Sequence, residues 1–265
     1  MSKSSAINDR FRFAVDTARS TASIALTHFQ STRLTVENKP DGSFVTEADR
    51  AVETDLRRRI RDSFPGDGIV GEEFGETAGA SNYRWVLDPI DGTTSFVHGV
   101  PLWGMLIAVE ENDEPVIGVI HMPALNEIVF AAQELGSWHC VGDRDPVATG
   151  VSSSKRLSDS LLCVTALDYF TKTDSTGAFH DLAARFGATR GWSDCYAHLL
   201  VATGRVDAVV EPMINAWDVA PMIPIMHEAG GRFTDWRGRQ TAYGQTAVAS
   251  NGHIHDQVLA LLADR

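Results

Sequence analysis

Two acidic side chains stand at the end of an apolar run in the stretch WVLDPIDGTT, residues 85–94. Asp88 follows the run directly, and Asp91 comes three positions later, before Gly92 and two threonines. A carboxylate at the end of a buried strand is costly unless a hydrogen bond or an opposite charge compensates it. The pattern therefore raises the question of which partner these carboxylates have.

Three more acidic residues hold the same kind of position. Glu72 follows GIVG, Glu211 follows DAVV, and Asp218 opens a predicted helix after INAW. Each motif alone is common, and a capped or solvated turn explains it equally well. Ligands of α/β proteins often bind beyond strand ends, however, so these carboxylates are predicted to converge.

Convergence of these acids would call for a divalent cation. Two like charges about 4 Å apart repel by about 4 kcal/mol at an effective dielectric constant near 20. A set of oxygen ligands, with no cysteine or histidine beside it, favours Mg²⁺ or Mn²⁺ over zinc.

The turn after Asp91 predicts an anion site beside that metal. Gly92 allows close approach of the backbone to a ligand, and Thr93 and Thr94 offer hydroxyls and amides, as helix starts do. Carboxylates beside such a turn suit a phosphate bridged by metal ions.

Four segments together resemble the inositol monophosphatase family of metal-dependent phosphatases. They are VTEAD (45–49), GEE (71–73), WVLDPIDGTTSFVHGVP (85–101) and WDVAPMIPIMHEAGG (217–231). The resemblance extends roughly from Lys39 to Asn251. It implies an α+β fold built as a five-layer α-β-α-β-α sandwich, a homodimer, and Mg²⁺ as cofactor, as two or three ions for which Mn²⁺ may substitute.

The resemblance also implies roles for individual residues. The metal ligands are expected to be the side chains of Glu72, Asp88, Asp91 and Asp218 and the carbonyl of Ile90. Thr93 with its partner Asp49, helped by Glu72, is expected to orient and activate the attacking water. Gly92, Thr93 and Thr94 are expected to cradle the phosphate. The implied reaction is direct attack of metal-activated water on a phosphate monoester, without a phosphoenzyme.

The segment 189–200, TRGWSDCYAHLL, is expected to face the substrate together with Glu211. Asp194 either caps a helix or serves as counter-ion to a cationic substrate. Inositol and fructose phosphates carry no cation, whereas histidinol phosphate carries an ammonium group. GEEFGE, KPDGSFVTEADRAVE and RGWSDCY are similar to the histidinol-phosphate phosphatases of this family. Asp194 would then hold the ammonium, with Glu211 at the substrate's polar groups and Arg190 shaping the pocket.

Two alternatives stay open at this point. One is an inositol-1-phosphate or general sugar-phosphate phosphatase. The other is a non-catalytic protein that binds a phosphorylated ligand and regulates a partner, which the presence of every motif acid and of Thr93 disfavours.

Composition excludes several other classes of protein. The formal net charge of −12 disfavours a nucleic-acid partner, which usually meets a basic surface. Three well-separated cysteines, without a CxxC pair, indicate reduced thiols. We find neither a signal peptide nor an apolar run of 18 residues, so no membrane partner is expected and the predicted location is cytoplasmic.

The elements that must position these residues follow from periodicity and from turn residues. Helices are predicted at residues 7–29, 46–64, 177–186, 194–203, 218–229 and 256–263. Strands are predicted at residues 68–72, 84–87, 102–110, 115–123, 127–133, 160–166, 206–211, 231–235 and 246–250. The segment 136–155 is predicted to be a loop. We expect one phosphatase unit of two lobes, residues 1–150 with the metal site and residues 151–265.

Overall fold

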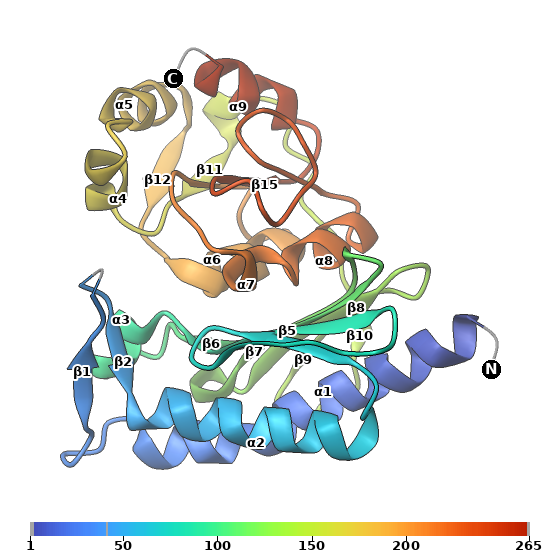
Figure 1. Ribbon diagram of the computed structural model, residues 1–265. Helices are drawn as coiled ribbons and strands as arrows, with labels where there is room; N and C mark the ends of the chain where they lie inside the picture. The colour runs from blue at the N-terminus through green and yellow to red at the C-terminus, as the bar shows by residue number, and fades with distance from the viewer. Residues whose placement is uncertain (1–2, 41, 264–265) are drawn as a thin grey trace.

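Helical layers and β-sheets alternate in the computed structural model, which describes residues 3–40 and 42–263 (Figure 1). Two long helices lie against an eight-stranded sheet, and shorter helices separate this sheet from a five-stranded one. Further helices cover the outer face of the smaller sheet. The five-layer α+β sandwich predicted for the chain is confirmed.

Helices α1 (Lys3–His28) and α2 (Glu47–Ser63) form the layer outside the larger sheet. Their buried apolar residues recur three or four positions apart, including Ala14, Ala18, Ala22 and Ala25 in α1 and Ala48, Val52, Leu56 and Ile60 in α2. A capping box between Thr46 and Asp49 starts α2, which ends two residues before Pro65.

The eight-stranded sheet takes its strands from residues 68–148. Its order is β10 (Val147–Ala148), β9 (Gly136–Val141), β8 (Glu127–Ala132), β7 (Glu114–Met122), β6 (Gly104–Glu111), β5 (Tyr83–Asp91), β3 (Gly68–Gly71) and β4 (Gly75–Thr77). Only β3 and β5 run parallel, and the other neighbours are antiparallel. A separate hairpin joins β1 (Val36–Asn38) and β2 (Phe44–Thr46).

The prediction that 136–155 is a loop was wrong in part, because this segment contains β9 and β10. A tight turn with Glu134 at φ 65° returns the chain along β8, and pairing runs from Gly136 to Val141. Polar and apolar residues are mixed in these two strands, so the local signal for a strand is weak. The neighbouring strand supplies the hydrogen bonds that decide the conformation.

The five-stranded sheet holds the carboxyl ends of three parallel strands at one edge. Its order is β12 (Ala188–Arg190), β11 (Leu161–Cys163), β13 (Ala208–Glu211), β15 (Ala247–Ser250) and β14 (Arg232–Thr234). Strand β11 is parallel to both β12 and β13. Residues that follow these strands therefore meet at the same edge.

The middle layer consists of α6 (Asp194–Ala202), α7 (Ala216–Val219) and α8 (Met222–Glu228). The single helix predicted at 218–229 was wrong, since the chain forms two helices that meet at Pro221. Proline has no N–H to continue the hydrogen-bond ladder, and a cap at Asn215 starts the first helix earlier.

Shorter helices complete the described part of the chain. They are α3 (Thr93–Val97), η1 (Pro123–Leu125), η2 (Leu157–Asp159), α4 (Leu167–Lys172), α5 (Thr176–Arg185) and α9 (His255–Leu262). Apolar clusters fill the space between α1, α2 and the larger sheet, the space around the middle helices, and the outer face of the smaller sheet. Among the described residues, no helix combines the length and hydropathy of a membrane span.

Candidate metal centre

A bulge at the end of β5 governs the directions of Asp88 and Asp91. Asp88 lies opposite Leu106 of β6 and Asp91 lies opposite Gly104, so β5 contains one extra residue between the two pairs. In a regular strand, side chains three positions apart point to opposite faces of the sheet. The extra residue breaks this alternation, which allows both carboxylates to reach one cluster.

Asp218 completes a cluster of three carboxylates. Asp88, Asp91 and Asp218 each place an oxygen within 4.8 Å of the others. Asp218 belongs to α7, which packs on β5 and β6. Its Oδ2 accepts a hydrogen bond of 2.7 Å from the amide of Asn215, whose side chain caps the helix in return. Of the five carboxylates predicted to converge, these three meet in the fold.

These three carboxylates lie together without a basic side chain beside them among the described residues; Asp88 is buried, and Asp91 and Asp218 are half-buried. Burial and the charges of Glu72, Asp91 and Asp218 raise the pKa of Asp88 well above its ordinary value. Burial and the charges of Asp194 and Asp218 raise the pKa of Asp91 well above its ordinary value. Burial raises the pKa of Asp218 to about 7. Within the described residues none of the three forms a salt bridge, so the donor set fits a divalent metal ion.

Glu72 borders this cluster but has a cation of its own. Lys39 places its Nζ 2.6 Å from Oε1 of Glu72 and 2.7 Å from Oε1 of Glu73. Burial and the charge of Glu73 raise the pKa of Glu72, although the hydrogen bond from Lys39 opposes this shift. Metal ligation by Glu72 would replace or share this contact.

The structure places Thr93 beside the carbonyl of Ile90. The Thr93 hydroxyl donates a hydrogen bond of 3.0 Å to this carbonyl oxygen. Asp49 accepts hydrogen bonds from the amide and hydroxyl of Thr46, at 2.8 and 2.5 Å. Its Oδ1 is buried without a partner among the described residues, and burial raises the pKa of Asp49 to about 7. Among the hydrogen bonds of the described residues, none joins Thr93 to Asp49.

Gly92 is required by its surroundings at the start of α3. Its φ of 80° is left-handed, and an added Cβ would lie 3.0 Å from the carbonyl oxygen of Leu102 and 3.2 Å from Oδ2 of Asp194. Thr93 and Thr94 are the first residues of α3, whose first amides have no acceptor within the helix. This turn can offer amides to an anion.

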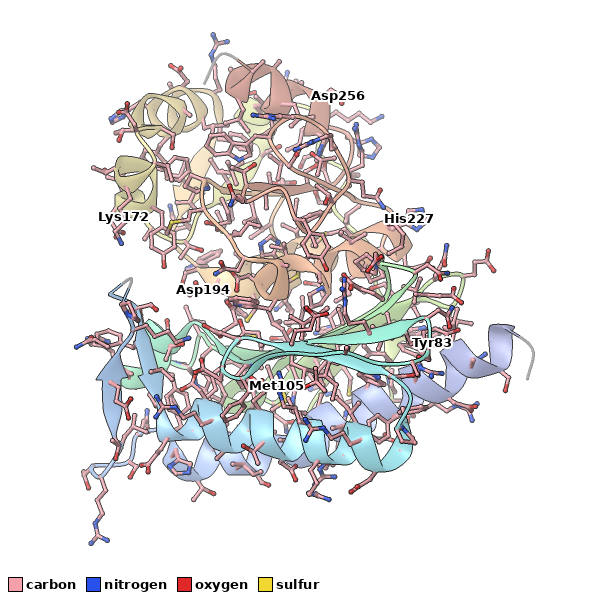
Figure 2. All side chains as sticks on the ribbon, viewed as in Figure 1. Tyr83, Met105, Lys172, Asp194, His227 and Asp256 are labelled. Carbon is pink, nitrogen blue, oxygen red and sulfur yellow. The ribbon has the colours of Figure 1, made fainter. Side chains whose placement is uncertain are left out.

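Asp194 and Glu211 come from the C-terminal half of the chain, at the start of α6 and the end of β13. Asp194 is the first residue of α6, and Figure 2 shows it where the middle helices face the larger sheet. The interpretation of Asp194 as a helix N-cap is wrong, because Ser193 occupies that position. Burial raises the pKa of Asp194 to about 6 and that of Glu211 to about 8. Arg190 is exposed at the end of β12 and donates to the carbonyl of Thr189.

Thr165 and Lys39 contact candidate site residues, although neither was predicted to do so from the sequence. Thr165 follows β11, and it hydrogen-bonds to Glu211 and Asp194. Its place just beyond a strand end is the signal that could have identified it. Lys39 precedes a turn in the hairpin between β1 and β2, and no local pattern indicates its contact with Glu72, 33 positions away.

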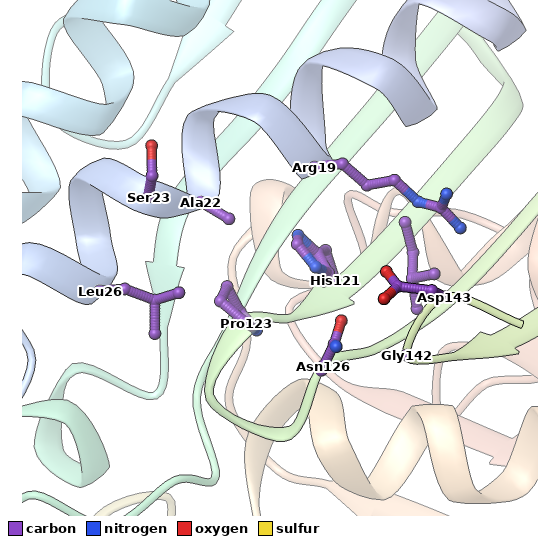
Figure 3. A pocket seen from close by; sticks show the side chains of 10 residues that line it. Arg19, Ala22, Ser23, Leu26, His121, Pro123, Asn126, Gly142 and Asp143 are labelled. Carbon is purple, nitrogen blue, oxygen red and sulfur yellow. The ribbon is translucent and has the colours of Figure 1, made fainter.

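A separate cavity of about 430 Å³ lies away from the acid cluster, between α1 and the strands β7 to β9 (Figure 3). Arg19, Leu26, His121 and Pro123 line it, and Asp143 is its one acidic lining residue. With a single carboxylate, this cavity lacks the ligand set of a divalent-metal site.

Known proteins resemble this chain over nearly its whole length. The model of the inositol monophosphatase family matches residues 8–265. A histidinol-phosphatase of Chlorobaculum parvum is 38% identical over 254 residues, covering 96% of both chains. One of Mycobacterium tuberculosis is 39% identical over 234 residues, covering 88% of this chain and 90% of the relative. The solved structure of a Thermotoga maritima IMPase superposes with a TM-score of 0.84 at 31% identity, covering 97% of both chains.

Proposed function

The chain belongs to the inositol monophosphatase family, and from this we propose that it is a Mg²⁺-dependent phosphatase that converts L-histidinol phosphate to L-histidinol in histidine biosynthesis. As a member of this family it is a phosphoric monoester hydrolase. The observation that carries the proposal is the cluster of buried Asp88 with half-buried Asp91 and Asp218, without a basic partner among the described residues.

The proposed metal ligands are the side chains of Glu72, Asp88, Asp91 and Asp218 and the carbonyl of Ile90. When bound, Mg²⁺ or Mn²⁺ would neutralise these carboxylates, polarise a phosphoryl oxygen and lower the pKa of a water. Two or three ions would share this ligand set. The clustered oxygens and their raised pKa values support the proposal.

Thr93, Glu72 and Asp49 are proposed to orient and deprotonate the attacking water. The hydroxyl of Thr93 donates a hydrogen bond to the carbonyl oxygen of Ile90. The lone pairs of the hydroxyl oxygen therefore remain free to accept a hydrogen bond from a water. Asp49, with an unpartnered oxygen and a pKa of about 7, suits the transfer of a proton near neutral pH. For Asp49 to pair with Thr93, the Thr93 hydroxyl would have to leave the carbonyl of Ile90. Gly92, Thr93 and Thr94 are proposed to hold the phosphate through their amides and hydroxyls.

The choice of substrate is supported by the charge of the side chains beside the acid cluster. Asp194 and Glu211 form no salt bridge with a described Lys, Arg or His, so this side of the site lacks a protein cation. The ammonium of L-histidinol phosphate would supply one, held by Asp194, with Glu211 at the neighbouring polar groups. Exposed Arg190 is proposed to shape the rim. Relatives named histidinol-phosphatase support this choice.

An inositol-1-phosphate or sugar-phosphate phosphatase is the second candidate. The similarity to an IMPase of Thermotoga maritima favours it. A neutral polyol would leave Asp194 and Glu211 uncompensated, which is why we place it second. A non-catalytic regulator is disfavoured, since every predicted metal ligand is present.

A substrate panel at equal Mg²⁺ tests the proposal. We expect kcat/KM for L-histidinol phosphate to exceed that for inositol 1-phosphate, fructose 1,6-bisphosphate, a nucleoside 3′-phosphate and p-nitrophenyl phosphate by about tenfold or more. Highest kcat/KM for inositol 1-phosphate would support the second candidate. Absence of phosphate release from every monoester, with Mg²⁺ or Mn²⁺, would support the regulator.

We further propose a homodimer in the cytoplasm. Cys140, Cys163 and Cys195 are all buried free thiols, which suits a reducing compartment. Sedimentation equilibrium would measure the oligomeric state, and a tagged chain in cell fractions would measure the location.

A further inference from the structure

The backbone of Asp194 has an unfavourable conformation. Its φ is 55°, in the left-handed region that residues with a Cβ rarely adopt. Such a conformation persists only where surrounding contacts enforce it, and it is concentrated at functional sites. The contacts of Asp194 therefore indicate what its position requires.

Thr165 makes the contact that satisfies the Asp194 backbone. Its hydroxyl oxygen accepts a hydrogen bond of 3.0 Å from the amide of Asp194, 29 positions along the chain. The usual device for the start of a helix is missing, because the N-cap residue Ser193 makes no capping hydrogen bond through its side chain. The first two amides of α6 have acceptors from distant segments instead: Thr165 accepts from Asp194, and Oδ2 of Asp91 accepts from Cys195 at 2.6 Å.

Glu211 fixes the direction of this hydroxyl. The Thr165 hydroxyl donates to Oε1 of Glu211 at 2.8 Å, and the Thr165 amide donates to the same oxygen at 3.0 Å. A hydroxyl has one proton, so donation to Glu211 leaves its lone pairs for the amide of Asp194. Glu211 is only 3% exposed, and Thr165 and Asp194 are half-buried.

This arrangement places the Asp194 carboxylate beside the turn of Gly92, Thr93 and Thr94, which is proposed to hold the phosphate. Its Oδ2 lies 3.2 Å from the point where a Cβ on Gly92 would stand. A shift of the α6 start would therefore change the distance between this carboxylate and a phosphate held at Gly92. The distance between the bound phosphate and the Asp194 carboxylate would have to match the distance between phosphate and cation in the substrate. It would therefore select substrates by the length of their alcohol group.

We propose that Thr165 is a positioning residue, which holds Asp194 in its left-handed conformation and so sets the selectivity for a phosphate ester with a cationic alcohol. This inference rests on the proposed function of Asp194 as counter-ion. It adds a residue that touches neither phosphate nor metal and acts through the backbone of another residue.

The test compares Thr165→Val, which keeps the shape and removes the hydroxyl, with Thr165→Ser, which keeps the hydroxyl. In Thr165→Val we expect kcat/KM for L-histidinol phosphate to fall at least about tenfold relative to that for p-nitrophenyl phosphate. Thr165→Ser should restore the ratio. Thr149→Val is the matched control, because the Thr149 hydroxyl bonds the carbonyl of Ala202 at the far end of the same helix. It should leave the ratio as in the wild type.

A second measurement tests the contact without relying on activity. Amide hydrogen exchange at Asp194, followed by heteronuclear NMR, should accelerate at least about tenfold in Thr165→Val and remain slow in Thr165→Ser and Thr149→Val. If Thr165→Val unfolds, Thr165→Ala provides the same readout. Unchanged exchange at Asp194 in the hydroxyl-free variants would overturn the proposal.

The two hypotheses fail in different ways. A wild type without preference for L-histidinol phosphate contradicts the proposed function, whereas the exchange data still decide whether Thr165 holds Asp194. A wild type with that preference, whose ratio survives Thr165→Val, overturns the positioning role.

Discussion

The two ends of the parallel pair β3 and β5 bury carboxylates in opposite ways. At one end Asp67, just before β3, accepts hydrogen bonds of 2.7 and 2.8 Å from the guanidinium of Arg10. Ser81 and the indole of Trp85 donate to the same carboxylate at 2.7 and 2.9 Å. Here the chain itself supplies the cation and satisfies both oxygens.

At the other end, Asp88, Asp91 and Asp218 gather with no basic side chain beside them in the described residues. Asp67 and Asp88 are both buried, so the burial of an acid alone does not distinguish the two ends. The difference is the source of the compensating charge. One end has its cation within the chain, and the other has the donor set of a divalent-metal site.

Removal of the metal should produce the largest effect. We expect phosphatase activity to disappear in excess chelator and to return with Mg²⁺ or Mn²⁺, because no side chain replaces the ion. Millimolar Mg²⁺ should also raise the Tm, since a ligand at 100 times its Kd stabilises the folded state by about 2.7 kcal/mol. Full activity after exhaustive chelation would contradict the proposal that the acids at this end need a metal ion.

The substitution Asp67→Asn should lower the free energy of unfolding by about 3 kcal/mol, since it leaves the guanidinium of Arg10 without its anion. The side chains of Arg10 and Asp67 are only 11% and 2% exposed. Urea denaturation of metal-free protein measures this change. Asp62→Asn is the control, because Asp62 and its partner Arg58 are 67% and 60% exposed, and we expect a change below about 0.5 kcal/mol.

Asp88→Asn should show the reverse pattern. We expect kcat/KM to fall at least about 100-fold, because a metal ligand and its charge are lost. The metal-free protein should be as stable as the wild type or more so, since like-charge repulsion is relieved. Steady-state kinetics and urea denaturation measure the two effects. Asp88 accepts a hydrogen bond of 3.0 Å from the amide of Ile90, which asparagine can also accept. A loss of metal-free stability equal to that of Asp67→Asn would mean that Asp88 also has a basic partner within the protein.

Asp194→Asn probes the acidic side of the pocket beyond the metal ligands. We expect kcat/KM for L-histidinol phosphate to fall about 30-fold relative to p-nitrophenyl phosphate, since the ammonium loses its counter-ion. The dependence on Mg²⁺ concentration should stay the same. Asp168→Asn is a nearby control, because Asp168 is 60% exposed and pairs with Lys172 at 3.0 Å. Equal small effects on both substrates would reject the counter-ion role.

The smallest expected effect is a dependence of metal-free stability on pH. The pKa values of Asp218 and Glu211, about 7 and about 8 in the folded protein, lie above the ordinary value of about 4. Protonation therefore stabilises the folded state; the contribution is complete below about pH 4 and is lost as the pH rises through 7 and 8. We expect the Tm in chelator to fall across this window, by about 2–4 °C per kcal/mol lost. A Tm that rises between pH 6 and 8.5 would contradict the raised values.

Local patterns predicted much of the fold and most of the site. The apolar spacing of α1 and α2 and the cap at Thr46 fixed both helices within a few residues. Asp88 and Asp91 were identified at a strand end and Asp218 near a helix start, because position relative to these elements can be read from neighbouring residues alone. The break at Pro221 could also have been read locally. Strands β9 and β10 could not, since their pairing with a neighbouring strand outweighs a weak local preference.

The sequence by itself determined which residues are acidic, where strands end, and that a glycine follows Asp91. Only the tertiary structure decided which charges meet. Asp67 contacts Arg10, 57 positions away, and Glu72 contacts Lys39, 33 positions away. Asp88, Asp91 and Asp218 instead lie beside one another. The contact of Thr165 with Asp194 likewise joins separate elements. These outcomes depend on distances between packed layers, and Coulomb and hydrogen-bond energies depend on those distances rather than on separation along the chain.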